Sequence, residues 1–331
     1  MKAIICTEYG NPDVLRLHDM AMPVANNTEV LIRVCAVSVN YGDLVARNIK
    51  NTTGKSFHMP LLFLILARFS FGLKRPGNKI LGNSFSGIIE SVGKNVKYFR
   101  KGDSVFGYTG EKMGAYAQYL CMSENGILAL KPLEMTFEEA STIPYGSLMA
   151  LHLLRKVKIQ KGQKVLIVGA SGGIGSAAMQ LAKYHFGANV TGVCGSKSAA
   201  FVKSLGAGKV IDYKKENYLN TGETYDLIFD ILGKGSFSSY KTSLNPGGIC
   251  LYASFKLRKL IRMLCASFGA RKKVVCAFAN PVKDDLVFVK QLVDEGKIKA
   301  VIDKCFPLEQ TAAAHRYSES GMKAGNVVIK I

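Results

Sequence analysis

A glycine-rich stretch in the middle of the chain constrains its fold more than any other feature. Val165–Gly169 is a short apolar run of the kind that forms a buried parallel strand. The turn Ala170–Gly175 follows, and beyond it small and apolar residues recur at helical spacing until Gly187. A strand, a glycine turn and a helix in this order are the context in which a glycine motif predicts a dinucleotide site.

The turn reads A-x-G-x-x-G, with alanine where the usual motif has its first glycine. Gly172 and Gly173 let the backbone approach a pyrophosphate, and Gly175 lets the helix pack closely on the strand. The helix N-terminus favours the phosphate charge. A purely structural glycine turn is the weaker interpretation, because strand and helix are both in place. The residues predicted to contact the cofactor here are Ala170, Ser171, Gly172, Gly173, Ile174 and Gly175.

The end of the second predicted strand indicates which dinucleotide binds. NAD sites carry an Asp or Glu about 20 residues past the glycines, which accepts a hydrogen bond from the ribose 2′-hydroxyl. Strand 189–194 is followed instead by Gly195, Ser196 and Lys197. A hydroxyl and an ammonium would hold a 2′-phosphate that a carboxylate would repel. Tyr213 is expected to contact the same phosphate or to stack near the adenine. We therefore predict NADP(H), against the alternative that Lys197 is an ordinary surface lysine.

The length and the strand pattern predict two domains. A chain of 331 residues can bury two cores. Short alternating strands separated by glycine turns predict a barrel-like β domain over residues 1–123. Strands and helices then alternate over residues 124–280, which suits a doubly wound parallel sheet. Residues 281–331 hold a helix and two strands that we expect to return to the first domain. The six strands of the parallel sheet are expected at 165–169, 189–194, 209–212, 226–231, 248–253 and 274–278.

The composition indicates a basic protein. The chain carries 44 Lys and Arg against 24 Asp and Glu, a formal net charge of +20, which attracts phosphates of any kind. Because the lysines run along the whole chain and no aromatic-interleaved RNA motif is visible, nucleic acid and membrane surfaces stay open as partners but are not favoured. Eight single cysteines without a C-x-x-C pair, and an N-terminus that begins with a strand, predict reduced thiols and a cytoplasmic location.

Two apolar segments depart from the rest of the chain. Residues 57–73 are strongly hydrophobic, but Pro60 and Arg68 leave a run too short for a membrane span of about 20 residues. Residues 256–273 combine basic residues with Leu and Ile at helical spacing, as in a basic amphipathic helix that lies on a membrane. We favour the alternative in which both segments cap a hydrophobic substrate cleft or pack on each other.

Six motifs spread over the chain share one resemblance. They are AVSVNYGD (36–43), GNSFSGIIESVG (82–93), KGDSVFG (101–107), VGASGGIG (168–175), LGAGKVIDY (205–213) and GNVVIKI (325–331). Together they resemble the medium-chain dehydrogenase/reductase superfamily, and within it the zinc-free quinone oxidoreductase-like reductases. The resemblance covers essentially the whole chain. It implies an α/β protein in which a GroES-like β-barrel catalytic domain precedes a Rossmann dinucleotide-binding domain.

The resemblance also implies chemistry without a metal. Zinc alcohol dehydrogenases of this superfamily have a cysteine at the position of Asn40 and a histidine at that of Asn83, and amides do not complete a tetrahedral zinc site. What remains is hydride transfer from NADPH to an acceptor that is already electrophilic, a quinone or an α,β-unsaturated carbonyl. By resemblance, Asn40 and Tyr41, with Asp43 nearby, hydrogen-bond the substrate oxygen, and Tyr41 is the proton donor of the motif. The alternative for Asp43 is to cap backbone N–H groups.

Further cofactor contacts follow from the same resemblance. Thr142 belongs to the stretch that precedes the dinucleotide fold, and Asn326 stands where many relatives carry a lysine near the cofactor. Other contacts are expected after the fourth and fifth strands, at the carboxyl ends where ligands bind in open α/β sheets. These residues are Ile231, Leu232, Gly233 and Tyr252.

Three alternatives remain beside a quinone or enone reductase. One is an enoyl- or acryloyl-thioester reductase. Another is an NADPH-binding protein that docks RNA, with little catalysis, and the third is one that docks an anionic membrane. A homodimer is expected by analogy with related proteins.

Overall fold

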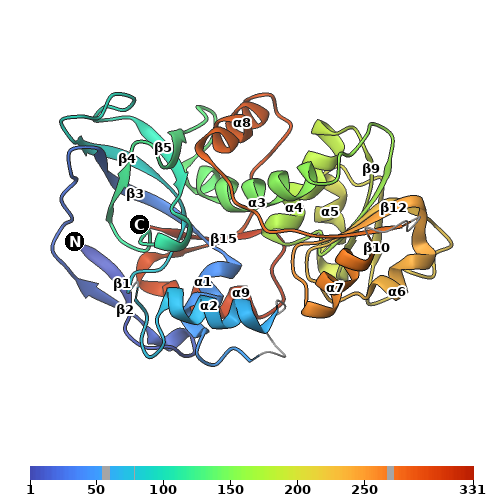
Figure 1. The fold of residues 1–331 in the computed structure, drawn as a ribbon. Helices are drawn as coiled ribbons and strands as arrows, with labels where there is room; N and C mark the ends of the chain where they lie inside the picture. Colours follow the sequence, from blue (N-terminus) through green and yellow to red (C-terminus); the bar gives the residue numbers. More distant parts are fainter. Residues whose placement is uncertain (54–59, 78, 267–271) are drawn as a thin grey trace.

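The computed structural model describes residues 1–53, 60–77, 79–266 and 272–331. Within these ranges the chain forms a β domain, which contains both termini, and an α/β domain beside it (Figure 1). Helix α3 (Phe137–Arg155) connects them, because it packs against α4 (Gly173–Gln180) in one domain and against strands β3 and β4 in the other. The GroES-like domain followed by a Rossmann domain, predicted from the motifs, is confirmed.

The β domain is built on one sheet with the strand order β14-β15-β3-β4-β5-β7, and β6 pairs with β3. The last residues of the chain complete this sheet, because β15 runs antiparallel to β3 with Val327 opposite Val39. Since β7 pairs with β5, the sheet extends to Leu130, beyond residue 123 where we expected this domain to end. The strands are β3 (Glu29–Val39), β4 (Ser84–Val92), β5 (Ser104–Tyr108), β6 (Tyr119–Ser123), β7 (Ile127–Leu130), β14 (Ile302–Pro307) and β15 (Asn326–Lys330), beside the separate pair β1 (Lys2–Cys6) and β2 (Leu15–Asp19).

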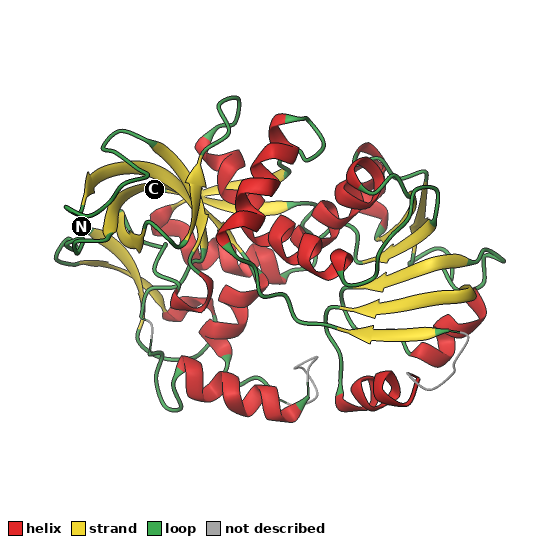
Figure 2. Cartoon of the chain, turned by 45° about the horizontal axis from the view of Figure 1, so that its top comes forward, coloured by secondary structure: helices red, strands yellow, loops and turns green. Residues whose placement is uncertain are grey.

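The α/β domain contains the predicted six-stranded parallel sheet, in the order β10-β9-β8-β11-β12-β13. Helices cover both of its sides (Figure 2). Val165–Val168 are therefore buried on both faces, which is why this strand reads as a continuous apolar run. The strands are β8 (Lys164–Val168), β9 (Asn189–Cys194), β10 (Lys209–Asp212), β11 (Tyr225–Asp230), β12 (Leu244–Tyr252) and β13 (Lys273–Cys276).

Helix α3 starts at a capping box. The Thr136 hydroxyl accepts a hydrogen bond from the backbone N–H of Glu139, whose carboxylate accepts one from the N–H of Thr136. Thr136 and Glu139 thereby satisfy two N–H groups that no helical carbonyl can reach. The remaining helices are α1 (Tyr41–Asn48), α2 (Leu61–Phe71), α5 (Ala199–Ser204), α6 (Phe237–Tyr240), α7 (Leu257–Ala266), α8 (Lys283–Asp294) and α9 (Thr311–Glu319).

The two apolar segments of the sequence contain α2 and α7, and their residues 57–59 and 267–271 lie outside the described ranges. Both helices lie at the same side of the molecule, α2 on the β domain and α7 on the α/β domain (Figures 1 and 2). Among the helices described, none is long and apolar enough to cross a membrane.

Candidate active site

The glycine turn brings the start of α4 against the end of β8. Gly169 has a φ of +91°, a conformation that favours glycine. A Cβ on Gly175 would lie 2.1 Å from the Gly169 carbonyl oxygen, so a glycine is needed for this close approach. A Cβ on Gly172 would meet nothing nearer than 3.7 Å. The first-turn N–H groups of α4 have no helical acceptors and are available to a phosphate. The turn therefore fits a dinucleotide pyrophosphate.

The C-terminal segment of the chain lies against this turn. The backbone N–H of Gly325 donates to the Ser171 carbonyl over 3.2 Å. Asn326 is buried, and its Oδ1 lies 3.0 Å from where a Cβ on Gly173 would stand. Its Nδ2 donates to the Val301 carbonyl over 3.0 Å. Asn326, predicted to bind the cofactor, is therefore located at the turn and fixes the β domain to it.

The predicted 2′-phosphate site contains a carboxylate that the sequence analysis missed. Ser196 and Lys197 are exposed after β9, and the Tyr213 hydroxyl lies 3.5 Å from where a Cβ on Gly195 would stand. The Ser196 hydroxyl, however, donates to Asp212 at the end of β10. The segment after the second strand has no carboxylate, whereas Asp212 comes from the third strand, which pairs beside the second. The hydrogen bond from Ser196 lowers the pKa of Asp212, and Lys214 and Lys215 contribute.

The loop after β11 is held by a buried carboxylate. Asp230 is fully buried and accepts hydrogen bonds of 2.9 Å from the N–H groups of both Gly233 and Gly235. Burial raises the pKa of Asp230. Leu232 lies over the glycine turn, 3.1 Å from where a Cβ on Gly169 would stand. The structure thus brings the loop Ile231–Gly233 to the glycine turn, where we predict the cofactor.

Helix α7 is anchored on the same loop by a lysine. Lys259 Nζ donates to the Gly233 carbonyl over 2.6 Å and lies 3.9 Å from the ring centroid of Tyr252, which is fully buried. Burial lowers the pKa of Lys259. Helical spacing within residues 256–273 does not distinguish Lys259 from the other basic residues of that segment.

Two amides form the centre of the catalytic side. Asn40 Nδ2 donates to Asn83 Oδ1 over 3.0 Å and to Ser38 Oγ over 3.2 Å, so both of its hydrogens have partners. Asn83 Nδ2 has no hydrogen-bond partner among the residues described, and it lies 3.5 Å from where a Cβ on Gly42 would stand. Asn83 is therefore the amide with a donor left for a ligand, and Asn40 orients it.

Three tyrosines surround the amide pair. Tyr41 begins α1 and is 54 % exposed, and burial of its hydroxyl end raises its pKa. Tyr145 on α3 lies 6.2 Å, centroid to centroid, from Tyr108 on β5. Burial raises the pKa of Tyr145, and the nearby charges of Tyr108, Asp43 and Tyr41 raise it further. The sequence analysis missed Tyr108 and Tyr145, which lie on different elements.

The amide pair and the glycine turn meet through neighbouring residues of α3. Tyr145 faces the tyrosine cluster, and a Cβ on the next residue, Gly146, would lie 2.5 Å from the Gly173 carbonyl. Thr142 is buried one turn earlier, where its hydroxyl donates to the Glu139 carbonyl. The predicted catalytic and cofactor residues therefore adjoin, although they come from different domains.

Asp43 lies beneath this site and is fully buried. Its carboxylate accepts hydrogen bonds from the N–H groups of Asn40 (2.8 Å) and Gly82 (3.2 Å). Burial raises its pKa to about 7, although these bonds and one from Tyr116 act in the opposite direction. This geometry matches the alternative in which Asp43 caps backbone N–H groups. Asp43 thereby fixes Asn40 and the backbone at Gly82, the residue before Asn83.

A buried polar chain continues from Asp43 to α9. The Tyr116 hydroxyl lies 3.1 Å from His315 Nε2, and Arg47 donates to His315 Nδ1 over 3.0 Å. Burial, with the charge of Arg47, lowers the pKa of His315 to about 3, so the imidazole is neutral. Arg47 also pairs with Glu319 at 2.5 Å. This chain fixes α1, which carries the predicted catalytic residues, to the C-terminal segment.

An aromatic contact links the apolar segment 57–73 to the other domain. Phe63 on α2 lies 4.7 Å, centroid to centroid, from Phe278, which itself lies 5.1 Å from Phe255. Phe278 follows β13 and Phe255 follows β12, at the carboxyl ends of the parallel strands. Phe63 of the first segment therefore contacts an aromatic pair that flanks the second segment, next to the edge where a ligand is expected.

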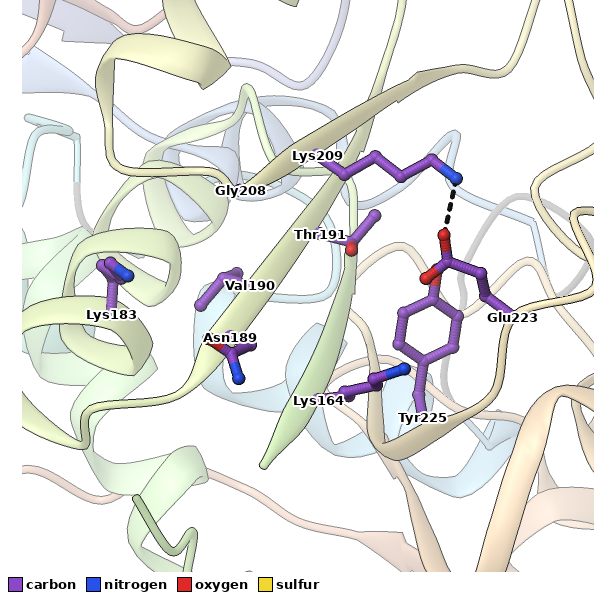
Figure 3. A pocket seen from close by; sticks show the side chains of 9 residues that line it. All are labelled: Lys164, Lys183, Asn189, Val190, Thr191, Gly208, Lys209, Glu223 and Tyr225. Carbon is purple, nitrogen blue, oxygen red and sulfur yellow. Dashed lines mark hydrogen bonds and ion pairs between the residues drawn. The ribbon is translucent and has the colours of Figure 1, made fainter. Parts of the chain in front are cut away.

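A pocket of about 180 Å³ opens at the opposite edge of the parallel sheet (Figure 3). Lys164, Lys183 and Lys209 line it, and Lys209 pairs with Glu223 over 2.7 Å. Open α/β sheets bind their ligands at the carboxyl ends of the strands, whereas this pocket lies at the amino ends. It is not part of the candidate active site.

In the part of the chain that the structure describes, no three His, Cys, Asp or Glu side chains are grouped so that they could hold a metal ion. At the position where the resemblance implies zinc ligands in alcohol dehydrogenases, this chain has the Asn40–Asn83 pair. The donor set there consists of amides, which are poor ligands for zinc.

Comparison with known proteins agrees with this architecture. Residues 26–132 match the family of the alcohol dehydrogenase GroES-like domain, and residues 205–329 match that of the zinc-binding dehydrogenase. The chain is 31 % identical to the human (Homo sapiens) mitochondrial NAD(P)H oxidoreductase RTN4IP1, over 100 % of this chain and 89 % of that protein. It is 30 % identical to 2-methylene-furan-3-one reductase of Solanum lycopersicum, over 99 % of this chain and 79 % of that protein.

Solved structures show the same fold. The quinone oxidoreductase from Coxiella burnetii superposes with a TM-score of 0.85 at 28 % identity, covering 100 % of this chain and 99 % of that one. Quinone oxidoreductase of Sus scrofa is 30 % identical in sequence, over 95 % of this chain and 93 % of that protein. The chain belongs to the medium-chain dehydrogenase/reductase superfamily, among its quinone oxidoreductase-like members.

Proposed function

We propose that this chain is an NADPH-dependent reductase that transfers a hydride to a quinone or an α,β-unsaturated carbonyl without a metal. The observation that carries the proposal is the hydrogen-bonded amide pair Asn40–Asn83, which adjoins a glycine turn that fits a dinucleotide. The names of relatives that are quinone oxidoreductases and alkenal/one oxidoreductases support it.

The residues of this chain serve mainly to polarise the acceptor. Bound NADPH would supply the hydride. Tyr41 Oη and Asn83 Nδ2 are the donors with no partner among the described residues, and they would hydrogen-bond the acceptor oxygen as negative charge develops on it. Tyr41 can then deliver its proton to the oxygen or leave that to water. Asn40 and Asp43 position these donors, because both amide hydrogens of Asn40 are already engaged and Asp43 is fully buried.

NADP(H) is proposed over NAD(H) because of the cations around the end of β9. Lys197 is exposed beside Ser196, and Lys214 and Lys215 flank Asp212. The negative charge of Asp212 would repel a 2′-phosphate. The Ser196 hydroxyl donates a hydrogen bond to this carboxylate, however, and the three lysines give the site a net positive charge. Lys197→Ala should raise the Kd for NADPH about tenfold and leave that for NADH unchanged, since a charge-assisted hydrogen bond contributes about 1.5–3 kcal/mol. Equal Kd values for both cofactors in the unaltered protein would contradict this choice.

The reaction is tested by following NADPH oxidation with quinones, enones and enoyl thioesters, on protein whose zinc content has been measured. We expect turnover of quinones or enones by metal-free protein. Tyr41→Phe should lower kcat/KM about tenfold to a hundredfold while the Kd for NADPH stays unchanged. Turnover of thioesters alone would favour the thioester reductase alternative. No turnover of any acceptor would refute the proposal.

Two further expectations remain predictions. One is a homodimer through an edge of the parallel sheet, where β10 and β13 are the edge strands. The other is a cytoplasmic location. Size-exclusion chromatography with light scattering tests the first, and cell fractionation the second.

A further inference from the structure

Acidic residues are missing from long stretches of this chain, so its positive charge is unevenly distributed, a feature that the total charge conceals. Residues 44–89 contain seven Lys and Arg and residues 231–283 contain ten, and neither stretch contains an Asp or a Glu. A third acid-free stretch, residues 140–211, contains most of α3 and the inner strands β8 and β9. The first two hold α2 and α7, which lie at the same side of the molecule (Figures 1 and 2).

Helix α2 presents an apolar face that the described residues do not cover. Its inner side packs on the small core around Ile49 and Leu64. Its outer side leaves five large apolar side chains between 43 % and 63 % exposed, at the spacing of one helical face. They are Leu61, Leu62, Ile65, Leu66 and Phe69. A contiguous exposed apolar face marks an interaction surface.

Helix α7 adds a second face that is both apolar and basic. Leu257 and Ile261 are 56 % and 51 % exposed, and Arg258 beside them is exposed as well. Lys259 and Arg262, by contrast, donate to other residues of the α/β domain. The cations of α7 are therefore divided between an anchoring set and a set that faces solvent.

Uncompensated cations surround both helices. Five exposed basic residues near them form no ion pair with any residue that the structure describes: Lys50, Lys74, Arg75, Lys256 and Arg258. Glu111 is an acidic residue in contact with α2, and it accepts a hydrogen bond from Ser70 over 3.2 Å. Apolar side chains with a cationic rim match a surface that offers acyl chains below a layer of negative charge.

We propose that α2 and α7 dock this protein on an anionic lipid membrane, with the exposed side chains of α2 inserted at the level of the headgroups. An 11-residue helix is about 16 Å long, so it can lie in the interface but cannot span the bilayer. RNA would satisfy the cations but not the five apolar side chains. A second copy of this chain meeting the same face would bring like charges together, which is unfavourable.

Docking would place the junction of the two domains next to the lipid. Phe63 on the inner side of α2 contacts Phe278, beside the carboxyl ends of the parallel strands. An apolar acceptor could then pass from the bilayer to the site. This last consequence rests on the proposed function, whereas the docking does not.

A tryptophan reporter tests the docking directly, because the chain contains no tryptophan. Phe69→Trp places an indole on α2, and Tyr98→Trp places one beside α8, at the far side of the molecule from α2 (Figure 1). With vesicles that contain phosphatidylserine and brominated lipid, we expect a blue shift and quenching for Phe69→Trp and neither for Tyr98→Trp. No change in Phe69→Trp, or equal quenching in both variants, would overturn the proposal.

Vesicle flotation of two kinds of variant separates the contribution of the cations to membrane binding from that of the apolar side chains. The partition coefficient on phosphatidylserine vesicles should fall about thirty-fold in Lys74→Gln/Arg75→Gln, since each cation near the surface contributes about 1 kcal/mol. It should fall at least about tenfold in Leu66→Gln/Phe69→Gln. The control Lys94→Gln/Lys97→Gln, beside α8, should bind unchanged.

Three results would reject the membrane as the partner. One is that the unaltered protein does not float with phosphatidylserine vesicles. Another is RNA binding that Lys74→Gln/Arg75→Gln abolishes and Leu66→Gln/Phe69→Gln leaves intact, without vesicle binding. The third is a concentration-dependent dimer that Leu66→Gln/Phe69→Gln abolishes, again without vesicle binding. All arms are run without substrate, so the outcome does not depend on the proposed reaction.

Discussion

Asn40 Nδ2 donates a 3.0 Å hydrogen bond to Asn83 Oδ1, which joins the start of α1 to the strand that follows Gly82. The bond leaves Asn83 Nδ2 as the unused donor of the pair. Two amides thereby supply an oriented N–H group at the site, and the backbone N–H groups held by Asp43 fix both of their segments. The orientation of Asn83 is thus built into the fold before any ligand arrives.

Replacing Asn83 should affect the reaction more than cofactor binding. Asn83→Ala removes the donor toward the acceptor and leaves a buried N–H of Asn40 without a partner, which costs about 1–3 kcal/mol of stability. We expect kcat/KM for a quinone to fall about tenfold to a hundredfold, with the Kd for NADPH unchanged. Steady-state kinetics and cofactor titration measure both. Asn189→Ala at the amino edge of the sheet is the control, and an unchanged kcat/KM in Asn83→Ala would contradict the assignment.

Two glycines of the same turn should respond differently to alanine. In Gly175→Ala the new Cβ would lie 2.1 Å from the Gly169 carbonyl, so strand and helix must separate. We expect a loss of stability of about 1–3 kcal/mol, seen in thermal melts. Gly172→Ala meets no close atom in the protein, so its Tm should be unchanged while the Kd for NADPH rises, because the methyl group enters the pyrophosphate site. A Tm loss in Gly172→Ala equal to that in Gly175→Ala would disprove this distinction.

Lys256, which precedes α7, and Lys259, in the first turn of α7, should differ in function. Lys259→Met removes the hydrogen bond to the Gly233 carbonyl and the contact with the Tyr252 ring. We expect the Kd for NADPH to rise about threefold to tenfold, since a hydrogen bond from a charged donor contributes about 1.5–3 kcal/mol, part of which is lost in the free protein as well. Lys256→Met, on the exposed side, should leave the Kd unchanged. Equal Kd values for the two variants would show that α7 does not support the cofactor loop.

Asp43 should make the folded protein less stable as the pH rises from about 4 to 7, which is opposite to the effect of a carboxyl group whose pKa is lowered by folding. Its pKa is raised to about 7 in the folded chain, so between about pH 4 and pH 7 the folded state holds a proton that the unfolded state has lost. The contribution of Asp43 to the free energy of unfolding is at most about 4 kcal/mol. It is fully present below pH 4 and is lost as the pH rises through 7. The free energy of unfolding of the unaltered protein should therefore fall relative to that of Asp43→Asn over this range, in urea titrations at several pH values.

His315 changes the stability with pH in the opposite direction to Asp43. The test is therefore the difference in the free energy of unfolding between the unaltered protein and Asp43→Asn, measured at each pH, because His315 contributes to both proteins. With a pKa lowered to about 3, the buried His315 binds fewer protons than in the unfolded chain, and its contribution is lost as the pH falls below about 6.5. A difference between the two proteins that does not change from pH 4 to pH 8 would refute the role of Asp43.

Local signals in the sequence determined the fold class and the position of the glycine turn. The buried strand Val165–Val168 and the glycines after it read directly as a strand, a turn and a helix, because each depends on neighbours in the chain. The strand pattern also led us to expect that the last strands return to the first domain, and β15 pairs with β3 in the sheet of that domain.

Only the tertiary structure decided which residues from distant parts of the chain are hydrogen-bonded to each other and which keep a free donor. Asp212 comes from the neighbouring strand to the Ser196 hydroxyl, where we predict the 2′-phosphate, and Asn83, not Asn40, keeps a spare donor. Lys259 anchors a helix while Lys256 faces solvent. Spacing along the chain shows which residues share a strand or a helical face. It does not show which partner from another element uses up a hydrogen bond, because that depends on how the two domains and their strands pack.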